Sequence, residues 1–486
     1  MTLKLKHAIY FIAGLSLLSF LPQNVYAQNE KPFDSSTIFC EKMDNKKLYS
    51  KNHFGSYKYL FPGTDGWIFR SESDLRQDFS LDEKAISNLT RLNQGFENQG
   101  SKLIIFFMPT RAMMHGNHIP ENIKKEYGYD RDRAWRSYKK AAASMEEIGI
   151  EVITIDRPQK EISFFYKRDH HWNPNGAKLA AQKVAQYIKA QPGYNTLNKK
   201  EYGTRLGKEY EFVGVSKKVF NKLCDTDQPP EYTHYRITQA VDEKSEASDL
   251  FGEATIPEVT LLGTSNSTQI PSQANFEGYL KEALSLDVLN MSKSGGGLDT
   301  AMLTYLKSEF FNENPSKYVL WEIPSYYDIS NHRQFFRSAL PLLLEKCTQE
   351  NAMLSKEVEI TETSQLVFNK LTEKQMTGSD YTISVSFDSI ISEPFQLDLR
   401  YEGNRDRFRF KPWKTEKQGT PYKMSLNENK TEYLDKIVLW SPNSNIGKTA
   451  RISVCKNTGP KTENEAELKS ASSVQSVWDK VKNIMN

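Results

Sequence analysis

A carboxylate and an imidazole that could act together lie in the segment Arg-Asp-His-His-Trp-Asn-Pro-Asn-Gly, residues 168–176. Asp169 and His171 are separated by one residue and precede an expected helix start, so both can face a cleft. The carboxylate can then orient the imidazole and stabilise its protonated form, which makes His171 a general base that needs a nucleophile. The alternative is that Asn173 only caps the helix and the histidines lie on the surface.

Ser265 is the candidate nucleophile, in the segment Leu-Leu-Gly-Thr-Ser-Asn-Ser at residues 261–267. A serine on a sharp turn after a buried strand is exposed at the rim of a sheet and can attack a carbonyl if a base takes its proton. The segment lacks the second glycine of the G-x-S-x-G elbow, so an ordinary turn is the alternative. Both segments follow strand ends, where one sheet would bring them together.

Gly295, Gly296 and Gly297 follow the next expected strand. Their bare backbone N–H groups could stabilise the oxygen that becomes negative in a tetrahedral intermediate, and the loss of one such donor typically costs about 3 kcal/mol of barrier. A flexible turn is the equal alternative.

Strands and helices alternate between about residues 100 and 330, which predicts an α/β fold with a parallel sheet covered on both faces. The expected strands are residues 103–108, 152–155, 259–262, a strand beginning at 288–289, and 318–323; the expected helices are residues 132–147, one beginning at Pro174, 276–284 and 298–311. Active sites in such sheets lie just beyond the carboxyl ends of the strands.

Two regions depart from this alternation. Residues 195–257 are polar and contain Pro229-Pro230, which indicates an insertion, as a lid or a tether. Short strands spaced by turns follow Cys347 and predict a small C-terminal β-sandwich. They are residues 382–387, 395–401, 408–410, 437–440 and 450–454, and the tail 461–486 is either helical or disordered.

The sandwich contains a basic strand. Arg405, Arg407, Arg409 and Lys411 fall on one face because alternate residues of a strand share a face, whereas Phe408 and Phe410 fall on the other. With Trp413 nearby, this basic stripe could bind an acidic polysaccharide. A solvated edge strand protected by positive charge is the alternative.

Two pairs of histidines raise the question of a metal. His115 and His118 have no carboxylate at a spacing that completes a ligand set, and the rings of His170 and His171 are expected to point apart, with His170 exposed. We expect no metal and no cofactor.

The chain begins as an export signal does. Lys4 and Lys6 precede an apolar run from Ala8 to Leu21 and a cleavage site at Val25-Tyr26-Ala27, so residues 1–27 are expected to be removed; a membrane anchor is the alternative. A net charge of +3 gives no reason to expect nucleic-acid binding.

Four cysteines, Cys40, Cys224, Cys347 and Cys455, remain after export. An even number in an oxidising compartment predicts two disulfides, and their spacing leaves three connectivities open. A metal site is the alternative, but no two of the cysteines form a CxxC pair.

Taken together, the motifs resemble the AlgX/AlgJ family of alginate O-acetyltransferases over most of residues 40–345. They are Asp-x-His-Trp at 169–172, Gly-Thr-Ser at 263–265, Pro-Gly-Thr-Asp-Gly-Trp-Ile-Phe at 62–69 and Met-Pro-Thr-Arg at 108–111. The resemblance implies a circularly permuted SGNH-hydrolase-like domain, here residues 28–346, with Ser265 as nucleophile, His171 as base and Asp169 as its orienting acid. It makes Arg111 a further candidate for contact with the oxyanion or substrate. It also implies the disulfides Cys40–Cys224 and Cys347–Cys455, and a carbohydrate-binding domain at 347–460.

The function implied by this resemblance is O-acetylation of an anionic exopolysaccharide in the periplasm. The implied partners are a membrane-bound acyltransferase and other polysaccharide-secretion proteins. Two alternatives remain: an acetylesterase that uses the same triad, and a non-catalytic polysaccharide-binding subunit. The oxyanion-hole asparagine of ordinary SGNH hydrolases has no clear counterpart, and related proteins act on polymers other than alginate.

Overall fold

A computed structural model describes residues 40–457 of the 486-residue chain, except 50–53, 58, 226–227, 230, 242–256, 271, 346 and 414–415. The expected signal segment and C-terminal tail lie outside the described residues. Within the described part, no helix is both long enough and apolar enough to cross a bilayer.

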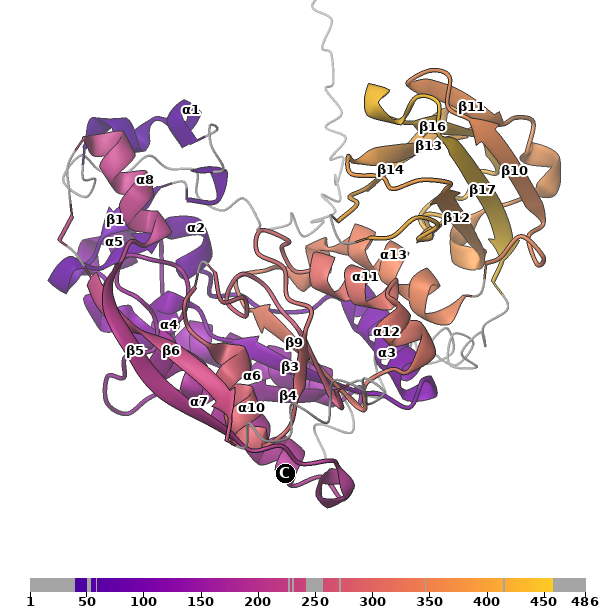
Figure 1. Ribbon diagram of the computed structural model, residues 1–486. Helices are drawn as coiled ribbons and strands as arrows, with labels where there is room; N and C mark the ends of the chain where they lie inside the picture. The colour runs from indigo at the N-terminus through magenta and orange to yellow at the C-terminus, as the bar shows by residue number, and fades with distance from the viewer. Residues whose placement is uncertain are drawn as a thin grey trace, which may run out of the picture.

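A five-stranded parallel sheet forms the centre of the larger domain (Figure 1). Its order is β4 (Glu151–Thr154), β3 (Lys102–Met108), β9 (Tyr318–Pro324), β7 (Val259–Leu262) and β8 (Val288–Asn290). Nearly every residue of β3, β7 and β9 is buried, as expected of parallel strands covered on both faces. The predicted α/β sheet is confirmed.

The helices of this domain pack in mutually contacting groups, with α7 (Pro174–Lys189) against α10 (Phe276–Leu284), and α13 (Arg333–Leu344) against both α3 (Glu83–Asn98) and α11 (Thr300–Leu306). The other helices include α2 (Ser71–Asp74), α4 (Arg111–His115), α5 (Glu121–Glu126) and α6 (Arg131–Glu146).

The sequence predicted one continuous helix over residues 298–311, and this prediction is wrong. The structure divides it into α11 and α12 (Glu309–Glu313). Ser308 has extended backbone angles, and its hydroxyl accepts a hydrogen bond from the Phe311 amide, so it caps a new helix and ends the preceding one.

The segment expected as a polar insertion contains regular structure. Strands β5 (Tyr202–Phe212) and β6 (Glu231–Ala240) form an antiparallel pair, and α8 (Val215–Cys224) lies between them in the chain. Helix α8 packs against the N-terminal segment, which holds α1 (Lys46–Tyr49), β1 (Leu60–Pro62) and β2 (Ile68–Arg70). Cys224 at the end of α8 is bonded to Cys40.

A β-sandwich follows α13. One antiparallel sheet has the order β10 (Leu354–Glu359), β17 (Thr449–Lys456), β12 (Tyr381–Phe387) and β15 (Tyr422–Ser425); the other has β11 (Ser364–Phe368), β16 (Leu434–Trp440), β13 (Phe395–Tyr401) and β14 (Asn404–Phe410). Side chains from both sheets share one apolar core. The predicted sandwich is therefore present, with β10, β11 and β15 added to the expected strands.

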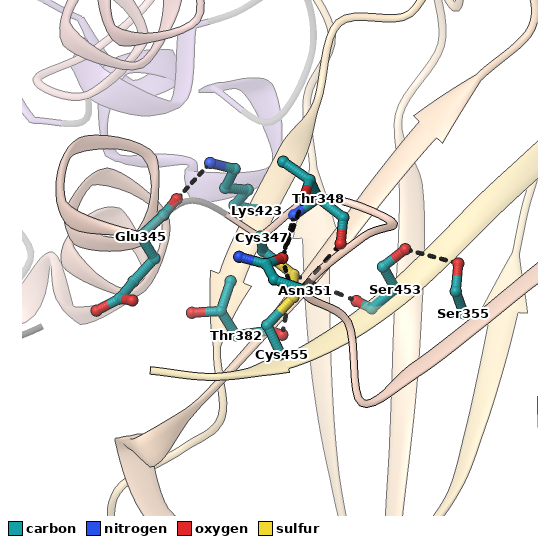
Figure 2. The surroundings of a disulfide bond; sticks show 9 residues. All are labelled: Glu345, Cys347, Thr348, Asn351, Ser355, Thr382, Lys423, Ser453 and Cys455. Carbon is teal, nitrogen blue, oxygen red and sulfur yellow. Dashed lines mark hydrogen bonds between the residues drawn. A yellow bond between two sulfur atoms is a disulfide. The ribbon is translucent and has the colours of Figure 1, made fainter. Parts of the chain in front are cut away.

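A second disulfide ties the chain entering the sandwich to its last strand. Cys347 is bonded to Cys455 of β17 and is buried. Around it, the Thr348 amide and hydroxyl both donate to Asn351 Oδ1, and Lys423 donates to the carbonyl of Glu345 (Figure 2). Both disulfides have the connectivity that the family resemblance implied.

The sandwich contacts the larger domain chiefly through α13 and β15. Arg337 of α13 forms an ion pair with Asp406 at 2.7 Å, and Lys307 pairs with Glu416, which also accepts a hydrogen bond from Tyr422. Lys307 and Glu416 are both buried, so this junction includes desolvated charge as well as apolar surface.

Candidate active site

Ser265 lies in the turn that follows β7, at the carboxyl end of the central sheet. Its neighbours from Leu261 to Ser267 are buried, whereas Ser265 itself is partly exposed. Gly263 permits this turn, because a Cβ there would lie 2.5 Å from the side chain of Ser267 and 2.9 Å from Glu322. The hydroxyl of Ser265 is therefore reachable on an otherwise buried turn.

The structure brings the Ser265 hydroxyl to His171. Ser265 Oγ lies 2.8 Å from His171 Nε2, and the other ring nitrogen of His171 is hydrogen-bonded to Asp169 Oδ1. Asp169 Oδ1 also accepts from the His171 amide at 2.8 Å. A hydroxyl, an imidazole and a carboxylate thus form one hydrogen-bonded chain, which is the arrangement that lets a base remove the proton of a nucleophile.

Local structure fixes the base. Pro174 occupies the first turn of α7, and the Asn173 side chain accepts hydrogen bonds from the amides of Asn175 and Gly176. A Cβ at Gly176 would lie 2.2 Å from the carbonyl oxygen of Phe164, so only glycine fits there. Asn173 therefore caps α7, as the sequence suggested. The histidines nevertheless do not lie on the surface, because the cap anchors the segment that carries them.

Asp169 is fully buried, and its second oxygen accepts a hydrogen bond from the Val215 amide at the start of α8. Burial alone would raise the pKa of the Asp169 carboxyl. The neighbouring His171 and His170 and the hydrogen bonds outweigh burial and hold that pKa well below its usual range. Asp169 is thus a carboxylate at neutral pH.

His170 is not exposed, and its ring does not point away from that of His171. Only 11% of its side chain is accessible, the two ring centroids are 3.7 Å apart, and its Nδ1 lies 2.8 Å from the Tyr57 hydroxyl. The expectation failed because the segment forms a turn and a bend rather than a strand, so neighbouring side chains do not alternate. Burial, followed by the charge of His171, lowers the pKa of His170 well below its usual range.

Among the described residues, Asp169, His170 and His171 form the one group of three potential metal ligands close enough to share an ion. Both ring nitrogens of His171 and the Nδ1 of His170 are already hydrogen-bonded, to Asp169, Ser265 and Tyr57 respectively. The other histidine pair is engaged elsewhere: His115 Nε2 accepts from the Phe165 amide, and His118 pairs with Glu161 at 2.6 Å.

Glu322 is a site residue that the sequence reasoning missed. It lies on β9, is fully buried, and accepts hydrogen bonds from the segment that carries Ser265. Burial raises its pKa, although hydrogen bonds from Thr264 and Ser267 oppose this shift. A single charged residue inside the apolar run Tyr-Val-Leu-Trp-Glu-Ile-Pro was the available signal, because buried strands rarely carry an acid without a partner.

Arg111 is buried rather than open to a ligand. Its guanidinium donates to Asp74 at 2.8 Å and to the backbone carbonyls of Ile68, Tyr166 and Lys167. It also lies over the rings of Trp67 and Phe69, which belong to the motif at residues 62–69. Through these contacts Arg111 links that motif to the segment just before Asp169.

The three glycines lie on a turn beside the Ser265 segment. Gly295 and Gly297 have φ of 74° and 67°, which favours glycine, and the Gly296 amide donates to the carbonyl of Lys293. The Lys293 amide in turn donates to the carbonyl of Gly263 at 3.0 Å. The glycine turn is therefore anchored to the end of β7, and the Gly296 N–H is used within the turn.

The basic strand is β14, an edge strand of the sandwich. Phe408 and Phe410 are buried, whereas Arg405, Arg407, Arg409 and Lys411 are exposed, as the alternation predicted. The ammonium of Lys293 lies 5.8 Å from the Trp413 ring. The candidate polymer-binding strand and the turn after β8 are therefore close to each other, and a cavity of about 90 Å³ between the domains has Arg409 and Lys411 in its lining.

Comparison with known proteins gives a consistent result. Residues 60–325, more than half of the chain, match the model of a family described as "SGNH hydrolase-like domain, acetyltransferase AlgX". The alginate biosynthesis protein AlgX of Pseudomonas aeruginosa is 28% identical over 400 residues, which are 82% of this chain and 83% of that protein. The probable alginate O-acetylase AlgJ of the same organism is 28% identical over 283 residues, which are 54% of this chain and 69% of that protein.

The solved structure of P. aeruginosa AlgX superposes with a TM-score of 0.74 at 25% sequence identity and covers 86% of this chain and 99% of that one. That likeness extends through the β-sandwich, whereas the family match is limited to the domain that holds the parallel sheet. The chain belongs to the AlgX family of SGNH hydrolase-like acetyltransferase domains.

Proposed function

We propose that this protein is a periplasmic O-acetyltransferase that acetylates an exported, anionic polysaccharide. The observation that carries the proposal is the hydrogen-bonded chain from Ser265 through His171 to Asp169. The names of the relatives AlgX and AlgJ support alginate or a similar polymer as the acceptor. The two disulfides support an oxidising compartment, which the protein would reach by export directed by residues 1–27 before that segment is removed.

The proposed reaction has two steps. In the first, His171 Nε2 takes the proton of Ser265 as Oγ attacks the acetyl carbonyl, and it then gives that proton to the departing group, which leaves an acetyl-serine. In the second, a sugar hydroxyl attacks the acetyl-serine while His171 takes its proton and returns it to Ser265. Asp169 stabilises the imidazolium in both steps because it is a buried carboxylate that is hydrogen-bonded to the His171 ring.

In this proposal the basic strand holds the polymer and a membrane-bound acyltransferase supplies the acetyl group. Exposed cations at Arg405, Arg407, Arg409 and Lys411 attract a polyanion, and Trp413 offers an aromatic face for a sugar ring. The sandwich, residues 347–460, then acts as a carbohydrate-binding domain. Arg407→Ala and Trp413→Ala should weaken binding of oligouronates, whereas Lys374→Ala, an exposed cation outside this strand, should not.

The deciding experiment is incubation of the purified protein with p-nitrophenyl acetate and an oligouronate, followed by mass spectrometry of the sugar. Acetylated oligomers are expected with the wild type and with Ser80→Ala, an exposed serine elsewhere, and should be absent with Ser265→Ala and His171→Ala. Release of p-nitrophenol without acetylated sugar would indicate an acetylesterase. Equal activity of Ser265→Ala would show that Ser265 is not the nucleophile, and a wild type that neither releases p-nitrophenol nor acetylates the sugar would leave only a binding role.

A further inference from the structure

The buried carboxylate of Glu322 is the centre of a hydrogen-bond network around the nucleophile. Glu322 lies on β9 between β3 and β7, opposite Phe106, with none of its surface exposed. A buried charge costs several kcal/mol unless it is paired or well hydrogen-bonded. A carboxylate in this position must therefore have hydrogen-bond donors around it.

Four such donors are present, and all belong to residues next to Ser265. The Thr264 amide donates to Glu322 Oε2 at 2.7 Å and the Thr264 hydroxyl at 3.0 Å. The Ser267 hydroxyl donates at 3.1 Å, and the Asn266 side-chain amide lies at 3.4 Å from Oε1. Glu322 thus contacts the residue before Ser265 and the two residues after it.

The four donors favour an ionised acceptor, in opposition to burial, which raises the pKa of Glu322. A carboxylate has only acceptor positions, so it can satisfy all four groups, whereas a carboxamide would face one of them with its own N–H. Glu322 is also close enough to His171 for the two charges to interact. Its negative charge therefore favours the imidazolium that forms when Ser265 attacks.

We propose that Glu322 is a positioning residue that fixes the turn of residues 263–267, so that Ser265 Oγ remains within hydrogen-bonding distance of His171, and that adds a second negative charge near the imidazole. This inference rests on the proposed function of Ser265. It assigns to β9 of the central sheet a part in the reaction that is separate from the contact between Asp169 and His171.

The test compares Glu322→Gln with the wild type in the full chain, with two readouts that need no polymer. One is kcat and KM for p-nitrophenyl acetate, and the other is the rate at which a sulfonyl fluoride labels Ser265, followed by intact mass. A displacement of the nucleophile by a fraction of an ångström should lower kcat and the labelling rate by roughly 10- to 100-fold. KM should change little, because Glu322 does not contact the ester.

Stability separates this role from a merely structural one. Burial raises the pKa of Glu322, so its charged form costs stability at neutral pH, and the neutral Gln offsets this cost against the one N–H that it turns toward a donor. The kinetics are therefore compared at equal amounts of folded protein, with urea denaturation of both proteins alongside. Asp398→Asn, another buried carboxylate but in the sandwich, is the matched control and should leave ester kinetics unchanged. Ser267→Ala, which removes one donor and keeps the carboxylate, should give an intermediate loss if Glu322→Gln does not fold.

The outcomes are distinguishable. Wild-type kcat and labelling in both Glu322→Gln and Ser267→Ala would overturn the inference while leaving the proposed function intact. A loss of rate that only follows a loss of folded protein would also overturn it. If the reagent labels Ser265→Ala as fast as the wild type, Ser265 is not the nucleophile, and the proposed function fails first.

Discussion

Trp172 connects the two segments that must meet in the site. It follows His171 directly, is fully buried, and its indole N–H donates to the carbonyl of Asn266, next to Ser265, at 2.9 Å. Its ring packs against Phe106 and Phe276. One side chain thus sets the separation between the base segment and the nucleophile turn.

Trp172→Phe should keep most of this packing and remove the hydrogen bond. We expect a loss of about 1 kcal/mol in the free energy of unfolding, since the Asn266 carbonyl loses one of its two donors and keeps the Ser272 hydroxyl, and a several-fold fall in kcat. Urea denaturation and ester kinetics measure the two effects. Unchanged kinetics would show that packing alone holds the two segments in register.

His115 gives a prediction for pH. Burial, with the nearby positive charges of Arg111 and His118, lowers the pKa of His115 to about 2. The unfolded chain takes up a proton near pH 6.5 and the folded chain does not, so stability should fall as pH decreases below about 6.5, by up to roughly 1.4 kcal/mol per pH unit.

His115→Gln removes this titration and should flatten the loss. Denaturation of both proteins at pH 7.5 and pH 5.0 measures the difference, and we expect the wild type to lose about 2 kcal/mol more than the variant over this interval. Parallel losses in the two proteins would mean that His115 gains its proton in the folded state.

Helix α8 is the element that holds Asp169 from outside the central sheet. Its first amide, that of Val215, donates to Asp169, and its last residue is tied to Cys40 by a disulfide. Between them, Val219, Phe220 and Leu223 pack into the N-terminal apolar cluster. Correct placement of the carboxylate therefore depends on a helix that the sequence reasoning did not expect.

Val215→Pro tests this dependence with little effect on the helix. Proline is well tolerated at the first helical position, and Gly214 has ψ of 155°, which suits a residue before proline, but the N–H that reaches Asp169 is lost. We expect kcat for acetyl transfer to fall about tenfold, because Asp169 is less well fixed. Val215→Ala, which keeps the N–H, is the control and should stay near the wild-type rate.

The sequence predicted best those elements whose pattern is local. The strands at residues 259–262 and 395–401 match β7 and β13 residue for residue, because continuous apolar runs and strict alternation are direct signs of burial. The β5–β6 pair was missed because both strands are largely exposed and polar, so they carry no such sign. The expected helix at 132–147 agrees with α6 to one residue at each end.

The residues of the candidate site also fall into those that local patterns reveal and those that only long-range contacts bring together. Ser265, Asp169 and His171 were found from residue types at strand and helix ends, which local patterns reveal. Glu322 and the Val215 amide act across sheet and chain, over 55 to 58 residues in the case of Glu322 and 46 in that of Val215, and a single sequence does not show which distant residues meet. The turn that brings the rings of His170 and His171 together was likewise hidden by the assumption of an extended segment.

At the level of the entire protein, the junction between the two domains is held by buried charge. Lys307 and Glu416 have 7% and 4% of their side chains exposed, and Glu416 also accepts from Tyr422. Removal of one partner leaves the other as an uncompensated buried charge, which typically costs 3–5 kcal/mol.

Glu416→Ala should therefore lower the free energy of unfolding by about 3 kcal/mol, and Lys307→Met combined with Glu416→Leu should recover much of that loss, because no charge is then left buried. Denaturant unfolding of the three proteins measures this. If the double variant is as unstable as the single one, the junction depends on the shape of the pair rather than on its charge.

The attachment of the sandwich through this junction bears on the product as well as on stability. In the proposed function the polymer is held at the basic strand and Ser265 carries the acetyl group, so the protein would set the distance between the bound part of the polymer and the reacting serine. Such an enzyme would acetylate sugar units at a recurring distance from the bound part of the polymer. The acetyl groups of the product would then be regularly spaced instead of randomly distributed.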